Sequence, residues 1–321
     1  MSILVVGSVA LDDIQTPFGK RTGMLGGACV YFASAASLYT SVGVVGVVGE
    51  DFPRRHIDFL SSRDVDVRGL QIVEGETFLW AGRYGEDLGD AETLDTQLNV
   101  FAGFHPVIPG DLCEADSVFL ANIDPDLQLE VLEQMDAPRL TALDSMNFWI
   151  SSKRDSLTRV LSQVDLVLLN ESEVRQFAEE PNLLLAAQQI LDLGPKALVV
   201  KRGGYGAMLV AQGQRLEERY FFVPAYPSEN VIDPTGAGDT FAAGFMGYLD
   251  REKDFSLGSL RQAIVHGAVV ASFTVEDFSI DGLRDLSMDD IQERYEILRC
   301  LTYFEPMSET RCKRVQRSLI D

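Results

Sequence analysis

The feature that most constrains this chain is a repeated alternation between short apolar runs and longer stretches with helical spacing. The apolar runs, each bounded by turn residues, lie at 3–6, 42–48, 118–120, 140–143, 166–169, 197–200 and 207–210. Such runs are typical of buried strands. Their alternation with helices favours a mostly parallel sheet that is covered on both faces. The sequence therefore predicts a doubly wound α/β fold, with helices on both faces of one sheet.

Two segments interrupt this alternation, at about 13–25 and 69–101. Residues 77–84 alternate in the manner of exposed antiparallel strands rather than a crossover helix. Because long structureless loops are uncommon in compact domains, we expect both segments to form a small β lid. The alternative is a pair of long surface loops. The chain is thus predicted to be a single α/β domain over 1–321 with this lid, and its polar end at 309–321 is predicted to be a frayed tail.

The charge of the chain excludes several partners. There are 27 basic and 49 acidic residues, giving a formal charge of −22. Such a surface repels phosphodiester backbones and anionic lipid, so neither nucleic acid nor a membrane is expected as a partner. An anionic ligand would need a local positive site made from backbone dipoles or a metal. The four cysteines have no CxxC spacing, and no basic leader or membrane-length apolar run is apparent, so we expect a cytoplasmic protein.

The most informative segment is a glycine turn formed by Gly236, Ala237, Gly238 and Asp239. Apolar residues follow it at helical spacing, which predicts a helix that begins near Ala237. A turn of this kind leaves backbone N–H groups free at the helix start. The helix dipole adds about half a positive charge there. The turn is therefore predicted to bind an anion without a basic side chain.

Asp239 lies in the first turn of that predicted helix. An acid at this position can simply stabilise the helix end. Its combination with Asp233, a proline and a glycine-rich anion site favours a chemical role instead. A carboxylate beside a bound phosphoryl group can take the proton from an attacking hydroxyl, which is general-base catalysis worth about 10²–10⁴-fold in rate.

The run DPTGAGDTF at 233–241 resembles the C-terminal signature of the PfkB, or ribokinase-like, family of carbohydrate and nucleoside kinases. The resemblance extends through weaker motifs over most of the chain. It implies a ribokinase-like fold with a β lid over the phosphate acceptor, and transfer of the γ-phosphoryl group of ATP to a hydroxyl group with Mg²⁺. It also implies that Asp239 is the base and that the amides of Gly236, Ala237 and Gly238 form the anion hole.

The weaker motifs suggest where the acceptor binds. The resemblance places Asp12 at the acceptor hydroxyls, and Gly26 and Gly27 match a di-glycine motif against which the acceptor lies. Alone, Asp12 is equally a turn residue. Tyr31 stands where the family usually has an asparagine, which removes an amide that often contacts the acceptor. The aromatic residues that could form a stacking wall for a nucleobase, or equally the core of the lid, are Tyr31, Phe32, Trp80, Tyr84 and Phe101.

The resemblance also assigns residues to the nucleotide and to cations. Those assigned to the nucleotide are Asn170, Glu173, Lys201, Gly203, Gly206, Thr235 and His266. Asn170 and Glu173 also have the spacing of a helix capping box. Glu173 is expected to handle Mg²⁺, and Asp233 matches part of a monovalent-cation loop. Read without the family, Lys201 belongs to an exposed turn and His266 is a structural histidine.

The sequence favours an ATP-dependent kinase that acts on a small sugar or polyol. The alternatives are a nucleoside kinase of the same fold, with an adenosine-like or cytidine-like acceptor, and a non-catalytic ligand sensor. A nicotinamide-dependent dehydrogenase is disfavoured because no GxGxxG follows the first strand, and no P-loop motif occurs. A homodimer that pairs through the lid is also an expectation.

Overall fold

The computed structural model describes residues 2–305, so the tail expected at 309–321 lies outside the described residues. The large sheet has the strand order β13-β12-β11-β10-β9-β8-β1-β4-β5. Its strands are β1 (Ile3–Val6), β4 (Val42–Gly49), β5 (Asp66–Val73), β8 (Ser117–Leu120), β9 (Leu140–Asp144), β10 (Leu166–Asn170), β11 (Ala197–Lys201), β12 (Ala207–Ala211) and β13 (Tyr220–Val223). Every strand expected from an apolar run is therefore confirmed.

The strands from β5 to β11 run parallel, whereas β12 is antiparallel to both of its neighbours. The residues between β11 and β12 are too few for a crossover, so the chain must turn back on itself there. Strand β13 was not predicted. Since it pairs with β12 in the opposite direction, it ends at the same edge of the sheet as β11.

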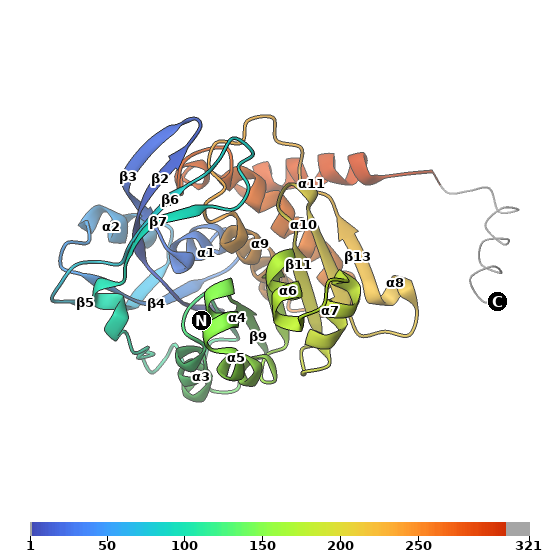
Figure 1. The fold of residues 1–321 in the computed structure, drawn as a ribbon, viewed down its shortest axis with the longest axis horizontal. Helices are drawn as coiled ribbons and strands as arrows, with labels where there is room; N and C mark the ends of the chain where they lie inside the picture. Colours follow the sequence, from blue (N-terminus) through green and yellow to red (C-terminus); the bar gives the residue numbers. More distant parts are fainter. Residues whose placement is uncertain (1, 306–321) are drawn as a thin grey trace, which may run out of the picture.

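Helices cover both faces of the large sheet, as predicted (Figure 1). One face packs against α1 (Ala28–Ala36), α2 (Arg54–Ser62), α9 (Ala237–Glu252), α10 (Leu257–Thr274) and α11 (Met288–Thr302). The other packs against α3 (Pro125–Gln134), α4 (Asn147–Ser152), α5 (Arg154–Leu161), α6 (Glu171–Ala178) and α7 (Leu183–Leu191). The short helix α8 (Leu216–Arg219) precedes β13. In β1, Ile3 and Val5 join the first core and Leu4 and Val6 the second, because successive strand residues face opposite sides.

A second, small sheet has the strand order β3-β2-β6-β7. It contains β2 (Ala10–Thr16), β3 (Gly19–Gly26), β6 (Leu79–Arg83) and β7 (Glu92–Gln97). The central pair β2–β6 is parallel and the outer pairs are antiparallel. The segment 69–101 is divided between two sheets, since its first residues belong to β5, where Gly69 pairs with Val45 of the large sheet.

The carboxyl ends of the parallel strands gather polar residues that come directly from the strand order. Asp144, Asn170 and Lys201 are the last residues of β9, β10 and β11, which are neighbours in the sheet. In open α/β sheets, ligands bind at this edge. Within residues 2–305, no helix is long and apolar enough to cross a membrane.

Candidate active site

The glycine turn forms the start of α9, as expected from the sequence. Gly236 caps the helix with a φ of 75°, a left-handed conformation that suits glycine. A Cβ at Gly236 would clash with the ring of Tyr31, so the turn also requires the absence of a side chain here. The N–H of Ala237 donates to the Pro234 carbonyl oxygen at 3.2 Å.

Within residues 2–305, the N–H groups of Gly236, Gly238 and Asp239 have no hydrogen-bond acceptor. Three unpaired backbone donors at a helix start form an anion site. Its composition differs by one residue from the expected one. Ala237 was expected to supply an amide, but its N–H is used within the turn, while that of Asp239 is free.

A lysine lies against this turn. An ideal Cβ atom built on Gly238 would be 3.3 Å from the Nζ atom of Lys201. The Lys201 ammonium donates to the carboxylate of Asp144, and both side chains are largely buried, with 15% and 6% of their surface exposed. Burial alone would lower the pKa of Lys201, but the nearby carboxylates of Asp144 and Glu173 outweigh it and keep the lysine protonated.

Asp239 points its carboxylate into this charged environment and remains partly exposed. No group within residues 2–305 donates a hydrogen bond to that carboxylate. Desolvation, followed by the charge of Asp144, raises the pKa of Asp239 to about 7, although Lys201 opposes the shift. A carboxylate with a pKa near neutrality and no fixed donor can accept a proton.

Asn170 and Glu173 form the capping box that their spacing predicted. The Asn170 side chain accepts from the Glu173 N–H at 2.8 Å, and Glu173 Oε2 accepts from the Asn170 N–H at 2.7 Å. Burial raises the pKa of Glu173 to about 7, while Lys201 acts in the opposite direction. Glu173 therefore has both a structural role and a buried carboxyl group near the lysine.

Asp233 is fully buried, and donors occupy both of its carboxylate oxygens. The Thr235 N–H donates to Oδ1 at 2.9 Å and the Ser279 N–H donates to Oδ2 at 3.0 Å. The carboxylate thus holds the segment at Ser279 against the residues that precede the glycine turn. Each oxygen accepts one N–H and keeps further acceptor capacity, so the monovalent ion expected at this side chain stays a prediction.

The residues expected at the acceptor come together beside the glycine turn. The Asp12 carboxylate fills the space in which a Gly26 side chain would lie, and Gly27 begins α1, which carries Tyr31. Asp12 is 3% exposed, and desolvation, with added repulsion from Asp233 and Asp239, raises its pKa to about 8. The Tyr31 hydroxyl is buried and has no partner within residues 2–305.

The small sheet reaches the glycine turn through Tyr84, directly after β6. The Thr235 hydroxyl donates to the Tyr84 hydroxyl at 3.0 Å, and the Tyr84 N–H donates to the Gln15 carbonyl oxygen of β2 at 2.8 Å. From the sequence, Tyr84 was predicted only as one of the aromatic residues near the acceptor or in the lid, and not as a contact of Thr235. No local signal pairs it with Thr235, since the two are 151 positions apart.

The aromatic residues that could have formed one stacking wall lie in different parts of the structure. Trp80 is paired in register with Asp12 on the adjacent parallel strand, so both side chains are on the same face of the small sheet. Phe32 is instead stacked on Phe119 in the core, with ring centroids 4.4 Å apart. Phe101 is stacked on Phe78 and Phe104. Tyr31 and Tyr84 instead contact the glycine turn and the residue before it.

His266 lies away from the glycine turn, and its assignment to the nucleotide stays a prediction. Its ring is stacked on Tyr248 at 4.4 Å, and Nδ1 is 3.0 Å from the Tyr39 hydroxyl. The last residue of α10, Thr274, contacts Thr240 near the turn, and His266 is eight residues earlier, about 12 Å along the helix. Desolvation lowers the pKa of His266 to about 4, which fits a neutral structural histidine.

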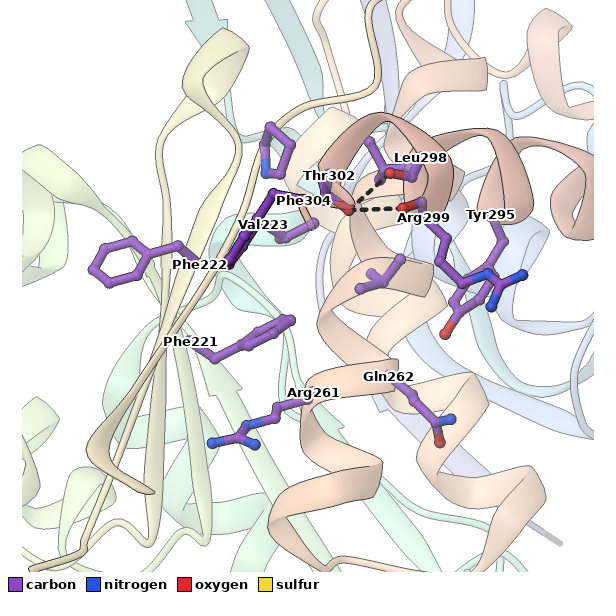
Figure 2. A pocket seen from close by; sticks show the side chains of 12 residues that line it. Phe221, Phe222, Val223, Arg261, Gln262, Tyr295, Leu298, Arg299, Thr302 and Phe304 are labelled. Atoms are coloured by element: carbon purple, nitrogen blue, oxygen red, sulfur yellow. Dashed lines mark hydrogen bonds between the residues drawn. The ribbon is translucent and has the colours of Figure 1, made fainter. Parts of the chain in front are cut away.

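The residues after Lys201 lead away from the glycine turn. Gly203 and Gly206 both have positive φ, and a side chain on Gly206 would clash with the Val223 carbonyl oxygen. Val223 and Pro224 line a cavity of about 360 Å³ between β13, α10 and α11 (Figure 2). The other lining residues are Phe221, Phe222, Arg261, Gln262, Val265, Tyr295, Leu298, Arg299, Thr302 and Phe304.

Comparisons with known proteins agree with this geometry. The model of the pfkB family carbohydrate kinases matches residues 19–282. A cytidine kinase of Thermococcus kodakarensis is 32% identical over 251 residues, which cover 77% of this chain and 87% of that protein. The crystal structure of the Methanocaldococcus jannaschii nucleoside kinase, an archaeal ribokinase-family member, superimposes with a TM-score of 0.74 at 21% identity, covering 92% and 99% of the two chains.

A putative ribokinase II from E. coli, solved in complex with ATP and Mg²⁺, superimposes with a TM-score of 0.76 at 19% identity, over 92% of this chain and 99% of that one. The fold expected from the sequence, a ribokinase-like α/β domain, is thereby confirmed. Together with the family match over most of the chain, these findings identify the protein as a member of the PfkB family of carbohydrate kinases, which transfer a phosphoryl group to a hydroxyl group.

Proposed function

We propose that the protein is an ATP-dependent kinase whose acceptor is a nucleoside, with cytidine as the first candidate. The observation that supports the chemistry best is the arrangement at the start of α9. There, three N–H groups without an acceptor in the described part of the chain lie beside a carboxylate that has no donor there and a pKa of about 7. An anion site next to a proton acceptor is what phosphoryl transfer to a hydroxyl requires.

The nucleotide would lie along the carboxyl ends of β10 and β11, with its terminal phosphate at the glycine turn. In that position the nucleotide would extend past Lys201, Gly203 and Gly206 toward Pro224 and the cavity. Val265 lines this cavity and is nine residues, about 13 Å, before Thr274 on α10. That separation suits the base of a nucleotide whose γ-phosphate is near Thr240 and Gly238.

The residues present fit Mg²⁺, which commonly binds through one or two carboxylates together with phosphates and water. Glu173 retains one oxygen that accepts no backbone N–H, and its buried carboxyl group would gain from a cation. Glu173 would therefore hold the ion, directly or through water. When bound with ATP, Mg²⁺ supplies charge neutralisation on the phosphates.

In the reaction, Asp239 takes the proton from the acceptor hydroxyl. The hydroxyl oxygen forms a bond to the γ-phosphorus as the bond from that phosphorus to the ADP oxygen breaks. The free N–H groups of Gly236, Gly238 and Asp239 stabilise the negative charge on the transferred group. Asp12 and the Tyr31 hydroxyl are placed to orient the acceptor.

The nucleoside acceptor is supported by the similarity to a cytidine kinase over most of the chain and by the position of Trp80. Trp80 is on the Asp12 face of the small sheet, where a base could stack on it. The sugar or polyol acceptor remains the second candidate, because the family matched is one of carbohydrate kinases.

The small sheet would act as the lid over the acceptor. Tyr84 already connects it to Thr235, and closure of a lid excludes water and limits ATP hydrolysis. Its outer strand β7 is exposed along its whole length, so a second copy could pair there. A homodimer through this sheet stays a prediction, which sedimentation velocity would test.

An ADP-release assay with ATP and Mg²⁺ tests the proposed function. Cytidine, adenosine and inosine would be compared with ribose and a polyol under the same conditions. We expect phosphorylation of a nucleoside with the highest kcat/KM. Turnover of free sugars alone would establish the second candidate, and the absence of turnover with every acceptor would contradict the kinase proposal for these acceptor classes.

A further inference from the structure

We propose that Lys201 is a catalytic residue that contacts the transferred phosphoryl group, and that Asp144 is the positioning residue that holds the Lys201 ammonium beside Gly238. This inference rests on the proposed function. It goes further by placing Lys201, which the family resemblance assigned only to the nucleotide, at the transferred group itself, beside the backbone N–H groups of the glycine turn.

The large sheet places both residues beneath the start of α9. Ala197 and Val199 of β11, and Leu140 and Ala142 of β9, face the core under α9 and α10. Because strand residues alternate, Lys201 and Asp144, each two positions further on, project toward the same face. Strand β10 lies between them, so the two side chains meet across it.

The hydrogen bonds of Lys201 are incomplete. Its ammonium has three donors, and within residues 2–305 Asp144 is the only acceptor. The side chain is largely buried, so unpaired donors there are costly unless a ligand meets them. Because Nζ lies next to Gly238, those donors can reach the same anion as the free N–H groups of the glycine turn.

Several carboxyl groups keep Lys201 in its charged form. Lys201 interacts with three carboxyl groups, those of Asp144, Glu173 and Asp239. Their negative charge favours the protonated lysine over the neutral one. A protonated lysine that Asp144 holds in place, with donors left over beside the glycine turn, is a preorganised group that can stabilise charge as it develops.

Lys201 lowers the pKa of Asp239 and Asp144 raises it, so the pH dependence of the reaction can test the proposal. The titratable groups around Asp239 are Asp144 on β9, Lys201 on β11, Asp12 on β2 and Cys29 on α1, with Glu173 on α6 next to the lysine. Removal of the lysine charge should raise the pKa of Asp239, and removal of the Asp144 charge should lower it.

The experiment compares Lys201→Met, Lys201→Arg and Asp144→Asn with the wild type. Steady-state kinetics across pH would be measured with ATP and the acceptor found in the screen. Lys196→Met is the matched control, because Lys196 precedes the same strand, is 78% exposed and pairs with Asp165 at 2.7 Å. Circular dichroism and thermal unfolding report folding, and ATP titration of each variant reports binding.

We expect Lys201→Met to lower kcat about 10²–10³-fold, the size seen when one donor to a transition-state charge is removed, while KM for ATP changes less than about fivefold. The acid limb of the kcat/KM profile should move to higher pH in Lys201→Met and to lower pH in Asp144→Asn. Lys201→Arg should retain more activity than the methionine variant, and Lys196→Met should match the wild type.

A folded Lys201→Met variant with wild-type kcat would overturn the proposal, as would a rise in KM for ATP with kcat unchanged. If the methionine variant does not fold, the other two variants decide the question. The proposal would be overturned if folded Lys201→Arg loses activity and the acid limb of the kcat/KM profile does not shift in Asp144→Asn. Failure of the proposed function is distinct, because the wild type itself would then phosphorylate none of the acceptors.

Discussion

Replacement of Asp12 by asparagine should stabilise the protein at pH 8 much more than at pH 5. Asp12 is 3% exposed and lies near Asp233 and Asp239, and burial raises its pKa from an ordinary value near 3.8 to about 8. The folded chain therefore keeps a proton that the unfolded chain releases. The resulting contribution to stability is fully present below about pH 3.8 and is lost as the pH rises toward 8.

The size of the effect follows from that interval. Each pH unit between the two pKa values corresponds to about 1.4 kcal/mol, which sets an upper limit of about 5 kcal/mol on the stability lost by pH 8. The part that falls between pH 5 and pH 8 is about 3.6 kcal/mol. Relaxation around the charged form reduces it, so we expect the advantage of Asp12→Asn to grow by about 2–3 kcal/mol over this range.

Equilibrium urea unfolding of the wild type and of Asp12→Asn at pH 5, 6.5 and 8 measures this difference. Asp13→Asn is the matched control, since the adjacent Asp13 is only partly buried in β2, accepts from the Gly23 N–H at 2.8 Å and loses the same charge. A stability difference between wild type and Asp12→Asn that stays constant from pH 5 to pH 8 would refute the electrostatic account of this site.

Four further outcomes are expected. Asp239→Asn should lower kcat by about 10²–10⁴-fold while ATP binding, measured by titration calorimetry, is retained; near-normal kcat would falsify the assignment of the base. In the wild type, kcat/KM should rise with pH through about 7 as Asp239 loses its proton, and a flat profile between pH 5.5 and 8 would contradict this. Tyr84→Phe removes one hydrogen bond to Thr235, worth about 0.5–1.5 kcal/mol, and should raise ATP hydrolysis relative to transfer by about 2–10-fold; an unchanged ratio would show that the small sheet does not cover the site. Val265→Trp should fill the cavity and raise KM for ATP with little effect on kcat, and an unaltered KM would place the base elsewhere.

Much of the fold could be predicted from the sequence because the parallel strands are buried on both faces. The run at 166–169, for example, must be apolar throughout, since Leu166 and Leu168 belong to one core and Val167 and Leu169 to the other. The edge strand β5 lacks this signature, because only Gly69 among its residues is buried. The sequence therefore gave no reason to separate it from the small sheet.

The parts of the site that depend on neighbouring residues in the sequence could be predicted. The contacts between residues that are far apart in the sequence could not. The glycine turn and the capping box of Asn170 and Glu173 each depend on spacing within a few residues. The contact between Lys201 and Asp144, however, depends on the order of strands in the sheet, which no local pattern specifies. The packing of His266 against Tyr248 and Tyr295 likewise joins residues of different helices, and no local pattern indicates it.

The bond between Tyr84 and Thr235 has a consequence for the sequence of events during turnover. It joins the small sheet to the residue that precedes the glycine turn, whereas the cavity between β13, α10 and α11 is lined in part by exposed residues such as Phe222 and Phe304. If the small sheet covers the acceptor as proposed, the nucleotide can enter and leave through this cavity without breaking the Tyr84–Thr235 bond. The acceptor and its phosphorylated product would pass only after that bond breaks, so we expect their exchange, and not that of the nucleotide, to limit turnover.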